Sequence, residues 1–106
     1  MVKFEDFQKI DLRVAKIIKA EKVENSEKLI KIEVDGKEEK RQIIAGIGKC
    51  YKPEDLIGKK IIIVWNLEPK VLFGLESKGM LLAANTEGGP VLLTVDKEVP
   101  AGTKIR

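Results

Sequence analysis

The side chains that most often carry out catalysis and metal binding are scarce in this sequence. There is no histidine, which removes the usual general base near neutral pH and the commonest metal ligand. Cys50 is the single cysteine, so one chain cannot build a zinc site from Cys and His. In the acidic pairs Glu38–Glu39 and Glu54–Asp55, neighbouring carboxylates point to opposite faces of a strand or face water at a helix start. A catalytic carboxylate pair is therefore not expected.

Two glycine-containing segments match catalytic or phosphate-binding motifs only in part. AGIGK, residues 45–49, lacks the full GxxxxGK[ST] spacing of a phosphate-binding loop, so a turn is the preferred interpretation. GLESKG, residues 74–79, places Ser77 three residues after Gly74, whereas a nucleophile elbow requires a spacing of two. We therefore expect a binding protein rather than an enzyme, with no cofactor and no metal ion.

Lysine supplies most of the remaining chemistry. The 20 Lys and Arg residues outnumber the 17 Asp and Glu residues, and the net charge of +3 permits a nucleic-acid partner without requiring one. The longest apolar run, residues 61–65, is too short to cross a membrane, and residues 1–10 contain no apolar signal-peptide segment. Cys50 cannot form an internal disulfide, which fits a reducing, cytoplasmic location. The length favours one domain, residues 1–106.

Apolar and polar residues alternate over short stretches, as is typical of half-buried strands. The pattern predicts strands over residues 12–23, 29–34, 38–46, 59–67, 80–85 and 91–96. In the first of these, the apolar positions change phase near Ile17 and Ile18, which indicates a bulged and strongly curved strand. Asp35-Gly36 predicts a hairpin with a type I′ turn before the third strand.

Short helices complete the expected elements. FEDFQKI, residues 4–10, can form one or two helical turns, and residues 53–56 suit the first turn of a second helix that Gly58 ends. Three strands, a short helix and then two or three strands predict an all-β fold with a short helix. This order fits the OB-fold, a five-stranded Greek-key barrel, while an SH3-like barrel and a small sandwich stay open as alternatives.

Three blocks of sequence resemble the tRNA-binding domain family. They are DLRVAKIIKAEKVENSEKL at 11–29, RQIIAGIGKCYKPEDLIGKK at 41–60 and NLEPKVLFGLESKGMLLAA at 66–84. The family includes the C-terminal domain of many methionyl-tRNA synthetases, free-standing tRNA-binding proteins, the endothelial monocyte-activating polypeptide and an export-chaperone homologue. The resemblance runs from about Phe4 to the C-terminus.

The resemblance implies a fold and a function. The family fold is an OB-fold with a C-terminal strand extension. Its members bind tRNA by shape, commonly at the outer corner of the L, and catalyse no reaction. The chain is similar in length to the free-standing form, which implies a homodimeric β subunit or trans-acting cofactor of methionyl-tRNA synthetase in aminoacylation. The alternative is an export-chaperone-like dimer of the same fold that binds proteins.

The family motifs carry the resemblance to individual positions. The pattern NADKL appears as NSEKL, RQI is retained, NLKP[RK] appears as NLEPK, and ESQGM appears as ESKGM. Glu68 stands where many members have lysine, and Lys78 replaces the usual glutamine. The matching positions predict an RNA-binding set of Asn25, Lys28, Arg41, Gln42, Lys70, Ser77, Lys78 and Met80.

Several of these residues also have a structural interpretation. Arg41 could pair with a neighbouring glutamate instead of phosphate, and Ser77 could cap a turn of the backbone. Met80 could fill the core, and Asn25 is a natural turn residue.

The aromatic residues are few. Trp65 is expected in the core, and for Tyr51 and Phe73 we expect packing rather than stacking on a base.

Overall fold

Apolar and charged residues alternate along β2 (Ile30–Asp35), and the computed structural model, which describes residues 1–106, follows that alternation. Ile30, Ile32 and Val34 are fully buried, whereas the charged residues between them are partly exposed. Because successive side chains of a strand point to opposite faces, one face of β2 covers the core and the other faces solvent.

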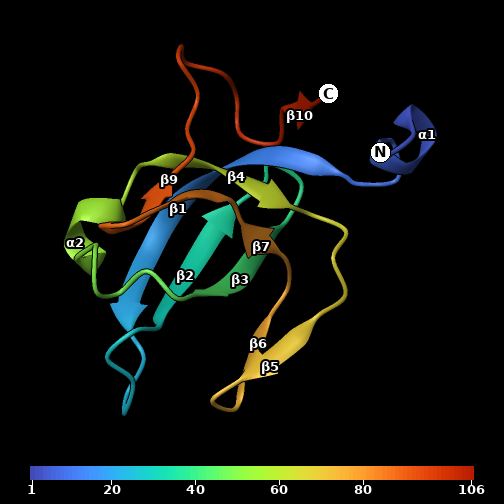
Figure 1. The fold of residues 1–106 in the computed structure, drawn as a ribbon. Helices are drawn as coiled ribbons and strands as arrows, with labels where there is room; N and C mark the ends of the chain where they lie inside the picture. Colours follow the sequence, from blue (N-terminus) through green and yellow to red (C-terminus); the bar gives the residue numbers. More distant parts are fainter.

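Five antiparallel strands form the barrel (Figure 1). Besides β2 they are β1 (Leu12–Lys22), β3 (Lys40–Ala45), β4 (Lys60–Val64) and β7 (Met80–Leu81). Their order is β3-β2-β1-β4-β7, and the chain beside β7 returns to β3, where the Lys78 N–H donates to the Gln42 carbonyl oxygen over 2.9 Å. This is the predicted five-stranded OB-fold.

The first strand bends because it serves two partners. Residues from Leu12 to Lys16 pair with β4, and residues from Lys16 to Lys22 pair with β2. The register shifts between Ile17 and Lys19, so Ile18 is the extra residue of a bulge. The predicted bulge is confirmed, and it lets one strand contribute to both sides of the barrel.

The hairpin between β2 and β3 was predicted, but the predicted turn type, I′, was wrong. Asp35 pairs with Lys40, so the loop has four residues rather than two. The left-handed residue is Lys37, with φ of 81°, and its N–H donates to the Asp35 carboxylate over 2.8 Å. Gly36 is needed for space, because a Cβ there would lie 2.3 Å from the Trp65 ring.

Two short helices flank the barrel. The predicted helical turns are α1 (Phe4–Phe7) and α2 (Pro53–Leu56). Leu56 is fully buried and anchors α2 at the barrel, and Gly58 follows with φ of 89°. Neither helix has the length or the apolar character needed to cross a membrane.

The second half of the chain departs from the expected strands. The predicted strand 80–85 is divided into β7 and β8 (Ala83–Thr86), and the predicted strand 91–96 ends early as β9 (Gly89–Leu92). The division falls at Leu82, whose N–H donates to Ile62 while its carbonyl accepts from Leu93. The backbone therefore changes partners there, although the β8–β9 hairpin itself was predicted.

The ends of the chain meet at the first strand. The last strand, β10 (Lys104–Ile105), pairs with Leu12 and Arg13, as expected for a C-terminal extension.

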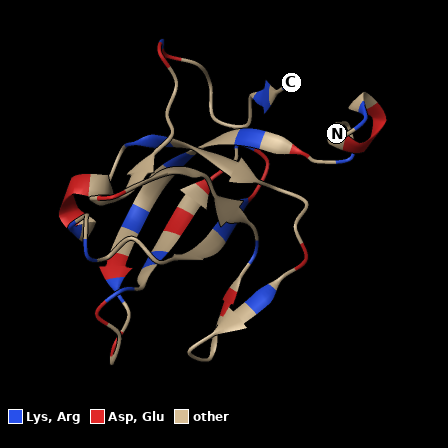
Figure 2. Ribbon diagram, in the orientation of Figure 1, with Lys and Arg blue, Asp and Glu red and all other residues tan.

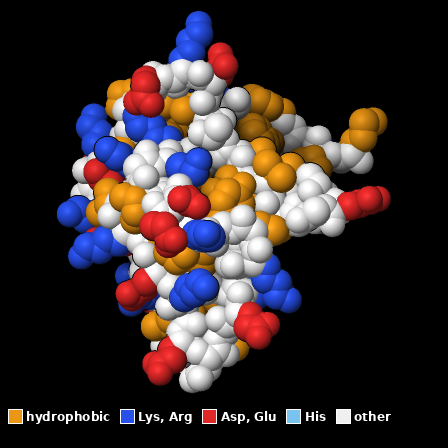
Figure 3. All heavy atoms as spheres, turned by 90° about the vertical axis from the view of Figure 1, so that its left-hand side faces the viewer, with side chains coloured by type: hydrophobic (Ala, Val, Ile, Leu, Met, Phe, Trp, Pro, Cys, Tyr) orange, Lys and Arg blue, Asp and Glu red, His pale blue; other side chains and the backbone are white.

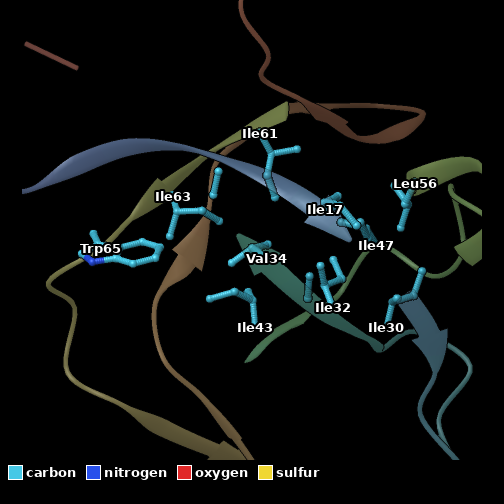
Figure 4. Close-up of a cluster of buried hydrophobic side chains, with 12 residues drawn as sticks. Ile17, Ile30, Ile32, Val34, Ile43, Ile47, Leu56, Ile61, Ile63 and Trp65 are labelled. Carbon is cyan, nitrogen blue, oxygen red and sulfur yellow. The ribbon is translucent and has the colours of Figure 1, made fainter. Parts of the chain in front are cut away.

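Branched aliphatic side chains from four strands fill the interior (Figure 4). Trp65 lies at one end of this cluster and Leu56 at the other (Figure 4). Trp65 is 5% exposed, which confirms its predicted place in the core. Burial of each large aliphatic side chain stabilises the barrel by about 1.5–3 kcal/mol.

Candidate nucleic-acid interface

An additional hairpin rises from the segment between β4 and β7. It consists of β5 (Lys70–Leu72) and β6 (Leu75–Ser77), with Lys70 paired to Ser77. Phe73 and Gly74 form its two-residue turn, with φ of 52° and 76°. Figure 1 shows the hairpin projecting from the same end of the barrel as the loop between β1 and β2. The segment was expected to be a connection without strands, so this hairpin corrects that interpretation.

A largely apolar cavity lies where the hairpin meets the barrel. Its volume is about 270 Å³, and its lining includes Lys70, Ser77, Met80, Glu68 and Gly46. Lys28 borders the same region, because a Cβ on Gly46 would lie 2.9 Å from the Lys28 Cε. Met80 is 47% exposed, so it is a surface residue rather than core filler. Three of the predicted RNA-binding residues, Lys70, Ser77 and Met80, therefore line one cavity, and Lys28 packs against Gly46 at its margin.

The lysines of this region differ in how freely they can meet a ligand. Lys28 and Lys70 are exposed and belong to no ion pair. Lys78 lies 3.7 Å from a carboxylate oxygen of Glu76, and both side chains are about half exposed. Such an exposed pair is weak and exchanges readily with water or phosphate. Two free cations and one loosely paired cation are thus available near the hairpin.

Elsewhere the surface is a mixture of both charges. Figures 2 and 3 show basic and acidic residues interspersed along the strands and over the face that carries them. On the outer face of β1 and β2, Lys31 lies 2.5 Å from Glu21, and Lys19 lies 3.8 Å from Glu33. The nearby lysine lowers the pKa of Glu21 through a hydrogen bond. These lysines are partly neutralised, in contrast to Lys28 and Lys70.

Asn25 occupies the turn between β1 and β2. Its φ of 66° is left-handed, a conformation that asparagine tolerates better than most residues. Its side chain is exposed and lines a groove of about 520 Å³ that also includes Phe73 of the hairpin. The turn interpretation is thus consistent with the geometry, and a contact with RNA stays a prediction.

Ser77 and Gln42 hold the hairpin against the barrel. The Ser77 hydroxyl accepts a hydrogen bond from the Ile44 N–H and donates one to the Gly79 carbonyl, each over 3.0 Å. Ser77 is only 5% exposed. The Gln42 amide donates to the Glu76 carbonyl over 2.9 Å. For Ser77 this geometry favours backbone capping over a direct RNA contact.

Arg41 is engaged by the protein itself. Its guanidinium carbon lies 3.9 Å from the centroid of the Trp65 ring, and the group donates to the Trp65 carbonyl and, over 2.8 Å, to Glu39. The hydrogen bond from Arg41 lowers the pKa of Glu39, so this carboxyl stays charged. The geometry therefore favours the interpretation of Arg41 as a partner of glutamate rather than of phosphate.

The glycines of AGIGK serve close packing. The Gly48 N–H donates to the Lys28 carbonyl over 2.7 Å, and a Cβ on Gly48 would lie 2.8 Å from that oxygen. This contact ties the 46–49 segment to the β1–β2 loop. In the whole chain, no group of three or more Cys, Asp or Glu side chains is placed to hold a metal ion.

Tyr51 and Phe73 have different environments in the structure. The Tyr51 hydroxyl accepts a hydrogen bond from the Leu92 N–H over 3.1 Å, and the residue packs against the core, as expected. Phe73 is 64% exposed, so its predicted packing was wrong. The signal for its position was a two-residue turn between apolar residues in LFGL, which is typical of a hairpin.

Comparison with known proteins decides the family. Residues 12–104 match the model of the family described as "Putative tRNA binding domain". The chain belongs to the tRNA-binding domain family. It is 62% identical over 104 residues to a methionine–tRNA ligase of Caldanaerobacter subterraneus subsp. tengcongensis, which covers 98% of this chain and 16% of the ligase.

Other relatives of this tRNA-binding domain agree. A methionine–tRNA ligase of Pyrococcus horikoshii is 54% identical over 105 residues, or 99% of this chain and 14% of the ligase. A solved structure of a MetRS-related protein from the same organism has a TM-score of 0.94 and 43% identity, with 100% of this chain and 98% of that chain covered. The chaperone CsaA of Bacillus anthracis has a TM-score of 0.90 and 40% identity, with coverage of 100% and 99%.

Proposed function

We propose that this chain binds tRNA by its shape and catalyses no reaction itself. The observation that carries the proposal is an unpaired Lys70 in the lining of a cavity whose Gly46 contacts the unpaired Lys28, in a chain of the tRNA-binding domain family. Unpaired lysines attract phosphate, and the exposed Met80 beside them offers an apolar contact for a base or ribose. Few exposed aromatic residues surround this site, which fits recognition of backbone and shape rather than of sequence.

The biological role we propose is that of a β subunit or trans-acting cofactor of methionyl-tRNA synthetase in the cytoplasm. The chain spans 16% of the length of its methionine–tRNA ligase relative from Caldanaerobacter, while a MetRS-related protein of similar length has the same fold. Both similarities support the proposal that this chain raises the local concentration of tRNA near the synthetase. The free Cys50 fits a reducing compartment.

A filter-binding assay tests tRNA binding. We expect tRNA to bind more tightly than duplex DNA of equal charge, and we expect the affinity to fall as salt rises. Equal affinity for the two nucleic acids, or an affinity independent of salt, would contradict the proposal.

A chaperone-like function is the second candidate, because CsaA structures share the fold over the whole chain. Such a protein would hold unfolded segments through apolar surface. Reversing the charges of Lys70 and Lys78 separates the candidates, since RNA binding would collapse while peptide binding would persist. A wild-type chain that binds unfolded peptide and holds no tRNA would support the chaperone function.

We further propose that two copies associate through the terminal segments. Phe4, Phe7 and Ile10 are exposed, and they border a groove of about 410 Å³ that also includes Ile105. Burying these side chains against a second copy would remove apolar surface from water. Light scattering at micromolar concentration should give the mass of a dimer, and a monomer would contradict this assembly.

A further inference from the structure

Phe73 stands at the tip of the β5–β6 hairpin in a conformation that phenylalanine rarely adopts. Its φ is 52°, at the first position of a two-residue turn that asparagine, aspartate or glycine usually fills. A bulky residue with positive φ is a genuine outlier, and such outliers gather at functional sites. A less strained residue would fit this turn, so the turn alone does not account for a phenylalanine at this position.

Packing within the chain does not supply that explanation. Phe73 is 64% exposed, and a Cβ built on the adjacent Gly74 would find no atom within 4 Å. The tip therefore extends freely into solvent. An aromatic ring in this position contributes little to the core of the chain and is available to an outside partner.

The partner must fit a groove with mostly polar walls. Phe73 and Leu75 of the hairpin line it, together with Asn25 and the acidic Glu24 of the β1–β2 loop. Lys22 also lines the groove, is exposed and belongs to no ion pair. An exposed aromatic ring beside an unpaired lysine suits a nucleic acid, which has flat bases and an anionic backbone, better than an apolar peptide.

A second polar groove adjoins this one. The two share Glu21 and Lys31, and the second, of about 490 Å³, continues over the outer faces of β1, β2 and β3. OB-folds bind single-stranded nucleic acid on the face around their second and third strands. The loop between the first two strands and the loop between the last two also contribute. A strand leaving the hairpin tip would thus have a continuous polar path along the barrel.

We propose that Phe73 stacks on an unpaired nucleobase of the bound tRNA, with Lys22 beside the phosphate of that nucleotide. This assignment rests on the proposed tRNA binding and adds to it a site for a splayed-out base. Single-stranded loops present such bases, which stack on aromatic side chains irrespective of sequence.

Three variants separate stacking from a structural role. Phe73→Asn places a residue that favours this turn, so we expect unchanged or higher stability with affinity for a methionine tRNA transcript reduced about 5- to 150-fold. Phe73→Leu keeps an apolar group without an aromatic face and should lose a similar factor. Phe73→Trp should bind at least as tightly as the wild type, with its added fluorescence quenched by tRNA.

Each opposite result would overturn the assignment. Wild-type affinity in Phe73→Asn would exclude stacking while leaving the proposed tRNA binding intact. Full affinity in Phe73→Leu would mean a merely apolar contact. A clear loss of stability in Phe73→Asn, or a change of oligomeric state in light scattering, would mean that the ring packs within or between copies. If the wild type itself holds no tRNA, the proposed function fails and the stacking site fails with it.

Discussion

The guanidinium of Arg41 lies over the ring of Trp65, with 3.9 Å between the guanidinium carbon and the ring centroid. The same group donates to the Trp65 carbonyl and to the Glu39 carboxylate, so it links the start of β3 to the residue after β4. Arg13 approaches the same ring at 5.3 Å. The family motif that contains Arg41 therefore has a structural task at the end of the barrel core.

Replacing Arg41 with lysine should weaken the fold more than it weakens RNA binding. Lysine cannot stack its charge as a plane on Trp65 and cannot donate to both oxygen partners at once. We expect Arg41→Lys to lower the free energy of unfolding by about 1–3 kcal/mol in urea denaturation. Its affinity for tRNA should stay within about twofold of wild type. Unchanged stability with a large loss of affinity would instead make Arg41 a phosphate ligand.

Ser77→Ala tests how the hairpin is attached to the barrel. The substitution removes the acceptor for the Ile44 N–H, which then stays buried without a partner. An unsatisfied buried donor costs about 1–3 kcal/mol, and urea denaturation should show a loss of that size. Thr86→Ala is the matched control, since its hydroxyl donates to Gly89 in an exposed turn. An equal, small loss of stability in both variants would contradict the role of Ser77 in holding the hairpin against the barrel.

Asp11 should make the fold sensitive to acid. The hydrogen bond from Arg13 is the main cause of its lowered pKa. Because the folded pKa lies below the unfolded value of about 3.9, the stabilising effect is complete above that pH. It is lost as the pH falls further, through the folded pKa. Urea denaturation from pH 7 downward should therefore show a smaller acid-dependent loss of stability in Asp11→Asn than in wild type.

The control for this pH dependence is Asp96→Asn, since Asp96 is exposed and belongs to no ion pair. It should follow the wild-type curve. Identical acid sensitivity in Asp11→Asn and wild type would refute the role of the Asp11–Arg13 pair, whose side chains meet at 2.8 Å.

Glu68 is the residue that fits the family pattern least well, and its place explains why it matters. It lines the same cavity as Lys70, where its negative charge opposes phosphate. Glu68→Lys should tighten tRNA binding by about fivefold, as expected for roughly 1 kcal/mol of favourable charge interaction in water. Glu87→Lys makes the same charge change in the exposed β8–β9 turn and should have a smaller effect. Weaker binding by Glu68→Lys would show that the carboxylate itself contacts the RNA.

The barrel was predictable because local patterns determine it. The alternation in residues 30–35 and the change of phase at Ile17 and Ile18 mark buried faces and a bulge without any knowledge of partners. The hairpin after Asp35 was predictable, but its turn type was not, since Gly36 is selected by the Trp65 ring, which is distant in sequence. The division of the strand at Leu82 depends in the same way on which neighbours its backbone meets.

The candidate site divides along similar lines. Lys28 and Lys70 could be identified from their motifs, and both are surface cations, Lys70 in the lining of the cavity and Lys28 against Gly46. The engagement of Arg41 and the burial of Ser77 depend on contacts with Trp65 and Ile44, which no local pattern reveals. Phe73 was misjudged because aromatic residues in short connections usually pack, and its hairpin turn was not identified.

We propose that tRNA binds at the end of the barrel where Lys70 lines the cavity and Lys28 packs against Gly46. The most direct test compares the double variant Lys28→Glu/Lys70→Glu with Lys97→Glu. Lys97 is exposed in the segment between β9 and β10. Figure 1 shows this segment at the opposite end of the molecule from the β5–β6 hairpin. Affinity for tRNA is measured across a range of salt concentrations.

We expect the double variant to lose at least about tenfold in affinity. We also expect a slope of log affinity against log salt that is smaller by about two, one for each phosphate contact removed. Lys97→Glu should remain close to wild type. A double variant that binds like Lys97→Glu, with the wild-type salt slope, would contradict the account.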